Sequence, residues 1–417
     1  MDDHRESRDN GYRPFAVNDA VEKAVKDLPV RKSPDSSQYS RDPHQPQRRR
    51  RRKRNPILKP FKYFFILIVI IIVAYYTFRV VDFVQKGTSV YISDAGFTHS
   101  DRFNSCAVLN GIDVSEHQGK DIKWKKVKSS GVDFAFIRAG YRSAEDGSLH
   151  ADAQFVRNIK GASNAGIMTG AYFYSQATTP AEAVDEAEFL LDKVKKYDIT
   201  MPLVIDFEIY PGGRVEKKIQ AGDLYAASLY HDIVLAFCRR VEKAGYESAV
   251  YANLDMLTHY MDAAILDDEA TLWLARYNTT ADLDADYMFW QCSDQGRIGG
   301  YTSNVDHDFW YVEPGKVYKT RGEGIKDKQR ISIGECHISF QRSVTKIKNR
   351  RAIPKLGITY EGRGLARGHD YQLSVVNNTG GDRGYIVVRG IGKYKNWMMV
   401  PFKIEDKSQD QEQDTEQ

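Results

Sequence analysis

The chain has 417 residues, so one ordinary domain does not account for it, and two folded units with tails are expected. A hydrophobic content of 42% excludes a wholly disordered chain, and the 31 glycines, which follow no regular repeat, exclude a collagen-like one. The net charge of +4 conceals a strong polarity, because a basic run occupies Arg48–Arg54 and an acidic, glutamine-rich tail follows Glu405.

An uncharged, apolar segment follows the basic run. Tyr63–Phe78 contains sixteen residues without a charge, and eleven of them are Ile, Leu, Val or Phe. At about −0.5 kcal/mol for each of these side chains, membrane insertion is favoured by about 5 kcal/mol. The long side chains of Lys62 and Arg79 can reach the interface from inside the bilayer. Residues 60–82 are therefore predicted to form a single transmembrane helix.

The position of the basic run predicts the orientation of this helix. Basic residues beside a membrane span mark its cytoplasmic side, so residues 1–55, which are polar, are expected to be a disordered cytoplasmic tail. The rest of the chain is then extracytoplasmic, on the periplasmic or cell-wall side of the cell membrane. A cleaved signal peptide is disfavoured by the long preceding segment and by the lack of a small-x-small site after Val73. Topology also explains the basic run better than a nucleic-acid site, so no nucleic-acid partner is expected.

After a linker at residues 83–105, apolar strands alternate with helical segments, a pattern typical of an α/β barrel. The eight predicted strands are Leu109–Val114, Val132–Ala139, Ile167–Tyr174, Pro202–Glu208, Ser248–Ala252, Leu272–Tyr277, Tyr287–Cys292 and a short one near Val305. The predicted helices between the first five are Trp124–Ser130, Ala153–Ala165, Ala181–Tyr197 and Ala221–Ala244. Because the gaps shorten after the fifth strand, the last three strands should lack full helices. Residues 106–316 are therefore predicted to form an imperfect barrel.

The last part of the chain changes character. Residues 318–405 contain alternating segments divided by Gly- and Asn-rich turns, namely Ile331–Val344, Tyr371–Val376 and Tyr385–Val388. This pattern predicts a small all-β module with a binding or spacing role for a ligand that the sequence does not identify. Residues 406–417 are expected to be a disordered acidic tail.

The four cysteines are Cys106, Cys238, Cys292 and Cys336, and they form no Cys-x-x-Cys or Cys/His pattern. This spacing argues against a structural zinc site, and no metal or other cofactor is expected. All four follow the apolar segment, a position compatible with disulfides in an oxidising compartment and equally with buried free thiols.

Acidic residues occur where the active site of a parallel barrel lies, at the carboxyl ends of the strands. Asp113 closes the first strand, Asp206 and Glu208 close the fourth, and Asp306 lies on the last. The i, i+2 spacing of Asp206 and Glu208 places both side chains on one face, with Phe207 on the other. Burial and mutual repulsion should then raise the pKa of one carboxyl, leaving a protonated acid beside an ionised partner. Glycoside hydrolysis needs such a pair.

Spacing alone leaves two other interpretations open. Acidic strand ends also form magnesium sites in barrels, and these carboxylates could instead form a salt-bridge cluster with Arg138 and Arg276.

Two segments, Gly111–Gly119 (GIDVSEHQG) and Leu203–Glu208 (LVIDFE), resemble the family 25 glycoside hydrolases, the Chalaropsis-type lysozymes. Further matching segments follow in the same order: Phe136–Gly140, Gly170–Tyr174, Trp273–Tyr277, Trp290–Gln291 and Asn304–Asp306. The resemblance covers residues 110–311. It implies a flattened (β/α)5(β)3 barrel and a retaining muramidase that cleaves the β-1,4 bond between N-acetylmuramic acid and N-acetylglucosamine in peptidoglycan.

The resemblance also implies roles for the carboxylates. Glu208 would be the general acid and then the base, and Asp206 would either orient the 2-acetamido group of the substrate or act as nucleophile. Asp113, counted among the catalytic residues, and Asp306 would line the same pocket, bind sugar and shape the pKa values of the acids. His117 receives no catalytic role.

Further substrate-binding residues are expected in the cleft. The aromatic candidates for stacking on sugar faces are Tyr172, Tyr174, Trp273, Tyr277 and Trp290. Gln291 and Arg138 complete the set, and Arg138 is expected to hold the carboxylates through charge-assisted hydrogen bonds. One departure from the family is a longer, more basic loop at Pro211–Arg214, which is expected to change substrate reach.

Two alternative functions are compatible with the same residues. The first is a catalytically inactive anchor that binds peptidoglycan, and the second is a hydrolase of another N-acetylglucosamine polymer such as chitin. The intact set of Asp113, Asp206 and Glu208 favours an enzyme over an inactive anchor.

Overall fold

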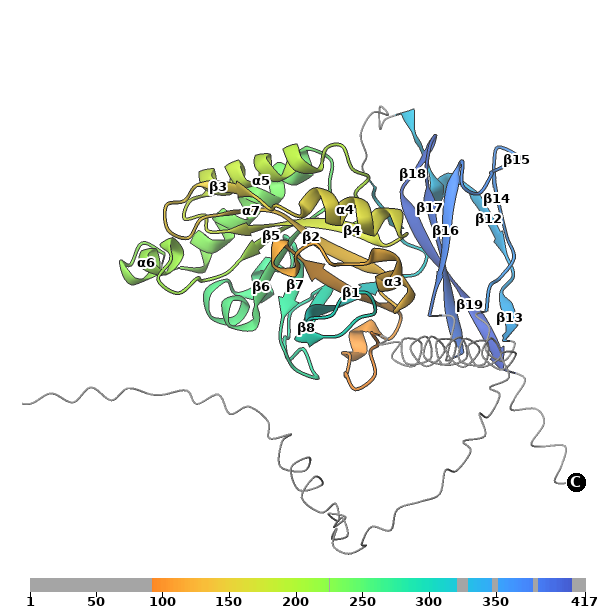
Figure 1. Ribbon diagram of the computed structural model, residues 1–417, viewed down its shortest axis with the longest axis horizontal. Helices are drawn as coiled ribbons and strands as arrows, with labels where there is room; N and C mark the ends of the chain where they lie inside the picture. The colour runs from red at the N-terminus through yellow and green to blue at the C-terminus, as the bar shows by residue number, and fades with distance from the viewer. Residues whose placement is uncertain (1–91, 225, 321–328, 347–351, 378–381, 407–417) are drawn as a thin grey trace, which may run out of the picture. The chain divides into compact units, whose positions relative to one another are not determined.

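The computed structural model describes residues 92–224, 226–320, 329–346, 352–377 and 382–406 (Figure 1). The predicted cytoplasmic tail, the predicted transmembrane helix, the first part of the linker (residues 83–91) and residues 407–417 of the acidic tail lie outside these residues. In the part of the chain that is described, no helix is long and apolar enough to cross a membrane. The described residues all belong to one compact unit.

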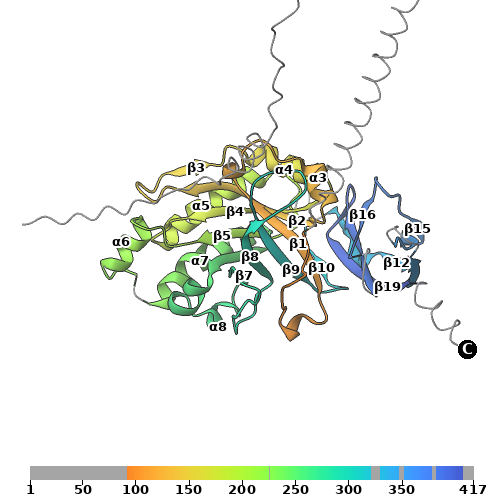
Figure 2. The same cartoon turned by 60° about the horizontal axis from the view of Figure 1, so that its bottom comes forward.

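Eight strands close into a barrel (Figure 2). They are β1 (Ala107–Val114), β2 (Phe134–Arg142), β4 (Met168–Ser175), β5 (Leu203–Phe207), β6 (Ser248–Asn253), β7 (Thr271–Ala275), β8 (Phe289–Gly296) and β9 (Val305–Val312). Their order is β1-β9-β8-β7-β6-β5-β4-β2, and a β1–β2 pairing closes the ring. Each predicted strand overlaps one of these eight, so the prediction of an α/β barrel is confirmed. The short strand β3 (Leu149–Ala151), which was not predicted, pairs with β2 outside the ring.

The direction of β9 determines at which end of the barrel Asp306 lies. β9 runs antiparallel to both β8 and β1, whereas the other neighbours in the ring are parallel. The start of β9 therefore lies at the same end of the barrel as the carboxyl ends of the parallel strands. Asp306, the second residue of β9, is brought to that end.

Helices connect the first strands as predicted. They are α3 (Trp124–Ser129), α4 (Phe155–Asn164), α5 (Pro180–Val194), α6 (Arg214–Gln220) and α7 (Ala227–Lys243). α5 begins with Pro180 in its first turn and with Thr179 Oγ1 accepting a hydrogen bond from the Glu182 backbone N–H. α5 and α7 pack side by side outside the barrel in both views (Figures 1 and 2).

One helix prediction needs correction. The helix predicted at Ala221–Ala244 begins only at Ala227, and the separate helix α6 lies before it. Gly222, with φ +77°, follows the end of α6 and interrupts the helical pattern. After β6 the connections are short, as expected: they contain a π-helix at Met256–Tyr260 and the four-residue α8 (Ala263–Leu266).

Aromatic side chains fill the barrel interior. Phe136 stacks on Trp273 with 4.3 Å between ring centroids, and Phe289 stacks on Trp310 at 5.2 Å. All four side chains are at most 1% exposed. This packing fills the middle of the barrel and leaves polar residues to gather at its carboxyl end.

The carboxyl-terminal part of the chain is a β module, as expected. Its strands are β10 (Val317–Tyr318), β11 (Ile331–Ser332), β12 (His337–Phe340), β13 (Ser343–Lys346), β14 (Leu356–Tyr360), β15 (Arg363–Gly364), β16 (Tyr371–Val376), β17 (Arg383–Gly390), β18 (Tyr394–Lys395) and β19 (Trp397–Asp406). The main sheet has the order β10-β19-β17-β16, with β13 paired to β19. The core of this module meets that of the barrel, because Trp397 packs edge-on against Trp310 at 5.2 Å.

The four cysteines are all free thiols, and Cys238 and Cys292 are buried. Of the two alternatives that the sequence left open, the structure therefore shows the free thiols.

Candidate active site

A cavity of about 240 Å³ opens at the carboxyl end of the parallel strands. Ten of the eleven predicted site residues line it, and Trp290 is the exception. The lining consists of Asp113, Ser115, His117, Gln118, Arg138, Tyr172, Tyr174, Asp206, Glu208, Tyr251, Trp273, Tyr277, Gln291 and Asp306. A larger cavity, of about 570 Å³, contains none of the predicted residues.

Strand register explains why one wall of this cavity is polar and aromatic. Tyr174 of β4 pairs with Asp206 of β5, Asp206 pairs with Tyr251 of β6, and Tyr251 pairs with Trp273 of β7. Side chains at paired positions of parallel strands lie on the same face of the sheet. The four residues therefore form a continuous row on the inner face.

Asp206 and Glu208 share this wall, as their spacing predicted. Phe207, between them, points to the other side and meets Tyr230 of α7 edge-on, with 6.2 Å between ring centroids. Burial raises the pKa of Glu208 above its ordinary value, and a hydrogen bond from Asp206 opposes this rise. Burial, followed by the charge of Glu208, raises the pKa of Asp206 well above its ordinary value. The pair therefore retains a proton at a pH where isolated carboxylic acids are ionised.

Asp113 is held by a short chain of hydrogen bonds. Gln291 Nε2 donates to Asp113 Oδ2 at 2.6 Å, and the Tyr251 hydroxyl donates to Gln291 Oε1 at 2.9 Å. Burial and the nearby Asp306 raise the pKa of Asp113 well above its ordinary range. Sequence reasoning missed Tyr251, although its register opposite Asp206 marks it as a cavity residue.

The barrel matches a known family of enzymes. Residues 112–301 match the family model described as glycosyl hydrolases family 25. The barrel is thus similar to this family over nearly its whole length. Among the similar curated proteins, the autolytic lysozyme of Clostridium acetobutylicum is 25% identical over 240 residues, which cover 57% of this chain and 67% of that protein. Lysozyme M1 of Streptomyces globisporus is 28% identical over 217 residues, covering 48% and 67%.

Among solved structures, the modular autolysin LytC from Streptococcus pneumoniae, in complex with a synthetic peptidoglycan ligand, is similar at 23% identity and a TM-score of 0.42. The match covers 49% of this chain and 47% of that one. The chain thus spans about two thirds of the two curated lysozymes and about half of the autolysin.

The barrel has a fifth carboxylate, beneath the cavity, that sequence reasoning missed. Asp308 of β9 is fully buried, and its Oδ1 accepts a hydrogen bond from Trp273 Nε1 at 3.1 Å. Burial and the neighbouring Asp113 raise its pKa well above the ordinary range. Burial and Asp294 also raise the pKa of Asp306, to about 6. The spacing of Asp306 and Asp308 is again i, i+2, so the rule that paired Asp206 with Glu208 would have found Asp308 as well.

The predicted aromatic residues that line the cavity lie at different depths in it. Trp273 is 1% exposed and forms the floor of the cavity, while Tyr172 and Tyr174 line its side. Tyr277 is 55% exposed and lies at the rim. An exposed ring at the rim is the one best placed to stack on a sugar face, and a ring on the floor shapes the pocket instead.

Trp290 does not lie in the cavity. It is fully buried on the opposite face of β8 from Gln291, where it meets Phe97 edge-on at 5.7 Å and donates from Nε1 to the Arg276 carbonyl at 2.8 Å. Consecutive strand residues point to opposite faces, so Trp290 and Gln291 cannot both face the substrate. The prediction of Trp290 as a sugar-stacking residue is therefore corrected.

The predicted role of Arg138 also needs correction. Its Nε donates to Asp152 Oδ2 at 2.9 Å and its Nη2 to Glu116 Oε1 at 3.1 Å, so these hydrogen bonds do not go to Asp206 or Glu208. The Arg138 charge still lowers the pKa of Asp206 from a distance. Arg276 pairs with Asp282 at 3.2 Å. The salt-bridge cluster considered as an alternative is therefore not formed.

A metal site at these carboxylates was the other interpretation left open. Within the described residues, no group of three or more His, Cys, Asp or Glu is arranged to hold a metal ion.

Proposed function

We propose that this protein is a lysozyme, a retaining N-acetylmuramidase that hydrolyses the β-1,4 bond between N-acetylmuramic acid and N-acetylglucosamine in peptidoglycan. The observation that carries the proposal is the Asp206–Glu208 pair, two carboxyl groups that share one wall of the cavity and have raised pKa values. The lysozymes of Clostridium acetobutylicum and Streptomyces globisporus, both similar to this chain, support the choice of substrate.

The pair suggests how the bond is broken. The proton that Asp206 shares with Glu208 passes through Glu208 to the oxygen of the leaving sugar as the glycosidic bond opens. Asp206 is then ionised, and its charge either orients the 2-acetamido group that attacks the anomeric carbon or makes that attack itself. Glu208, now ionised, takes a proton from the water that completes hydrolysis. Asp113 and Asp306 hold the sugar from the facing strands.

The test is digestion of purified peptidoglycan by the full chain in detergent, with the fragments analysed by mass spectrometry. Muropeptides with muramic acid at the reducing end are the expected products. Reducing-end glucosamine, or no cleavage with binding retained, would contradict the proposal and favour the inactive anchor in the second case. Equal rates on chitin oligosaccharides would instead indicate the broader substrate class.

A pH profile follows from the raised pKa values. Catalysis needs one proton on the Asp206–Glu208 pair, so kcat/KM falls at low pH, when a second proton binds, and at high pH, when the last proton leaves. Because both pKa values are raised, both limbs of the bell should lie at higher pH than the pKa values of free carboxylic acids, about 4. The profile is measured as initial rates on peptidoglycan across acidic, neutral and alkaline pH. A kcat/KM that stays constant at every pH above about 4, the pKa of free carboxylic acids, would argue against the shared proton.

We further propose that residues 60–82 anchor the protein in the cell membrane with the amino terminus in the cytoplasm. The support is the apolar run of Tyr63–Phe78 beside the basic run, both read from the sequence. The protein is expected to stay in the membrane fraction after a carbonate wash, and external protease should reach the barrel. Ile70→Arg, which places a charge at the centre of the span, should release the protein, whereas release of the unaltered chain would contradict the anchor.

A further inference from the structure

The loop that leaves Glu208 contains a tight turn. The Gly213 N–H donates to the Tyr210 carbonyl at 2.9 Å, Pro211 occupies the second position, and Gly212 has φ +74° at the third. Proline second and a left-handed glycine third are the requirements of a type II turn. The Gly212 N–H is also bound, by Glu216 Oε2 at 2.7 Å. The backbone of the loop after Glu208 is thus fixed at each of these positions.

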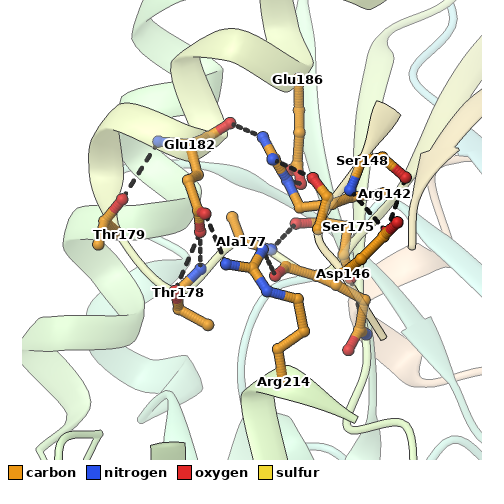
Figure 3. Close-up of polar contacts among 12 residues, drawn as sticks. Arg142, Asp146, Ser148, Ser175, Ala177, Thr178, Thr179, Glu182, Glu186 and Arg214 are labelled. Atoms are coloured by element: carbon orange, nitrogen blue, oxygen red, sulfur yellow. Dashed lines mark hydrogen bonds and ion pairs between the residues drawn. The ribbon is translucent and has the colours of Figure 1, made fainter. Parts of the chain in front are cut away.

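Arg214, the next residue, ties this turn to the neighbouring loops (Figure 3). Its Nη2 donates to Glu182 Oε1 at 2.6 Å and its Nη1 to the Gln176 carbonyl at 3.1 Å. Its backbone N–H donates to the Ala144 carbonyl at 3.0 Å. Burial alone would raise the pKa of Glu182, but hydrogen bonds from Arg214 and Thr178 outweigh it and lower the pKa. The ion pair is therefore charged and largely enclosed, with both side chains less than a quarter exposed.

The same network reaches the catalytic acid. Gln176 is fully buried, and its Nε2 donates to the Glu208 carbonyl at 2.8 Å. Gly147 packs against the Arg214 guanidinium so closely that an added Cβ would lie 2.8 Å from Arg214 Cζ. Arg142 of β2 anchors the base of the network by donating to the Glu182 carbonyl at 2.8 Å. The turn and Glu208 are thus held by one set of contacts.

The side chain that this rigid turn presents is Tyr210. It is 52% exposed, one of the few large hydrophobic side chains left open to solvent in the described residues. It follows Glu208, a residue of the cavity wall, by two positions, and after burial and the charges of Glu208 and Asp206 it contributes to the raised pKa of Tyr174 in the same wall. A tyrosine has only two side-chain torsions to immobilise, so little entropy is lost when a ligand packs on it.

We propose that Tyr210 stacks on a sugar ring beyond those held inside the cavity, and that Arg214 is a positioning residue that keeps the turn in place. The proposal rests on the proposed function and extends it, because it gives the substrate class as a glycan chain longer than the cavity itself holds. Sugar rings have an apolar face that packs on aromatic rings. The loop at Pro211–Arg214 that departs from the family pattern would thereby lengthen the binding cleft.

The test measures glycan binding and cleavage separately. In a Glu208→Gln background, where cleavage is blocked, Tyr210→Ala should weaken binding of a muropeptide hexasaccharide about tenfold and leave binding of a disaccharide unchanged. Tyr210→Phe should bind like the parent. Ile265→Ala serves as the control, because Ile265 is 53% exposed on α8 and lies outside the cavity lining. Equal hexasaccharide binding by the Tyr210→Ala variant and its parent would overturn the proposal.

Cleavage by chains that keep Glu208 completes the test. Tyr210→Ala should raise KM for long glycans about tenfold and leave kcat nearly unchanged. Arg214→Met should raise KM by a similar factor. In the double variant, KM should rise by less than the product of the two single factors, because both substitutions disturb the same turn. Full multiplication would remove the positioning role of Arg214. If the parent chain binds glycans through Tyr210 but cleaves none, the proposed function fails while the subsite stands. If the parent cleaves peptidoglycan and Tyr210→Ala changes neither binding nor KM, the subsite fails while the proposed function stands.

Discussion

Glu208→Gln is expected to reduce turnover of peptidoglycan by about a thousandfold while the protein remains folded. A side-chain amide has nearly the shape of the carboxylic acid but does not give up a proton to the leaving oxygen, and general acid catalysis contributes about 10² to 10⁴ in rate. Glu208 lines the cavity and keeps its hydrogen-bonding neighbour Asp206 in the variant, so binding of the glycan should survive. The measurement is kcat on purified peptidoglycan, with binding to insoluble cell wall followed in parallel.

The control for this prediction is Glu188→Gln. Glu188 pairs with Arg240 on the outer helices and is not among the residues that line the cavity, so its replacement should change kcat by less than about twofold. Turnover retained by Glu208→Gln would mean that another group supplies the proton, with Asp206 as the first candidate because burial keeps its pKa high.

Much of the barrel follows from the sequence for a simple physical reason. Strands buried on both faces are continuous apolar runs, and the helices that cover them have their own period, so the alternation is visible without knowledge of the fold. The period of two along a strand also placed Asp206 and Glu208 together and Phe207 apart. The family resemblance then supplied the roles of these carboxylates, which spacing alone left open.

The same period of two, applied to every strand, corrects the list of predicted site residues. Trp290 and Gln291 are neighbours on β8, so the assignment of both to the substrate conflicts with strand geometry. Asp308 shares a face with Asp306 but lies one step deeper in β9, so a prediction restricted to the strand ends misses it. Local rules are therefore sufficient to place both residues.

Other features depend on contacts between distant segments and have no local signal. Arg138 binds Asp152 and Glu116 because folding brings the segment after β1 and the segment after β3 next to the middle of β2. The partner of Arg214 is Glu182 on another helix, 32 residues away. A sequence indicates that a buried charged side chain needs a partner, but it does not indicate which residue that partner is.

The contact between the β module and the barrel is of this long-range kind, and Trp397 lies at its centre. The side chain is fully buried, stacks on Tyr318 with 4.3 Å between centroids, and meets Trp310 of β9 edge-on at 5.2 Å. Its Nε1 donates to the Thr200 carbonyl, in the segment before β5, at 2.9 Å. One cluster of buried side chains therefore includes barrel residues such as Phe289 and module residues such as Met399.

Trp397→Ala is accordingly expected to lower the free energy of unfolding by about 3 to 5 kcal/mol, the range found when a large aromatic side chain is removed from a core. Because Trp397 joins the two cores, the parent should unfold in one transition under denaturant, and the variant in two, with the module unfolding first. Ile353→Ala, at a side chain 62% exposed, is the control and should change stability by less than about 0.5 kcal/mol. A loss below about 1 kcal/mol with the single transition retained would mean that Trp397 does not couple the two cores. Two transitions in the parent itself would mean that the module and the barrel are energetically independent, and the module would then be better regarded as a separate binding unit than as part of the enzyme.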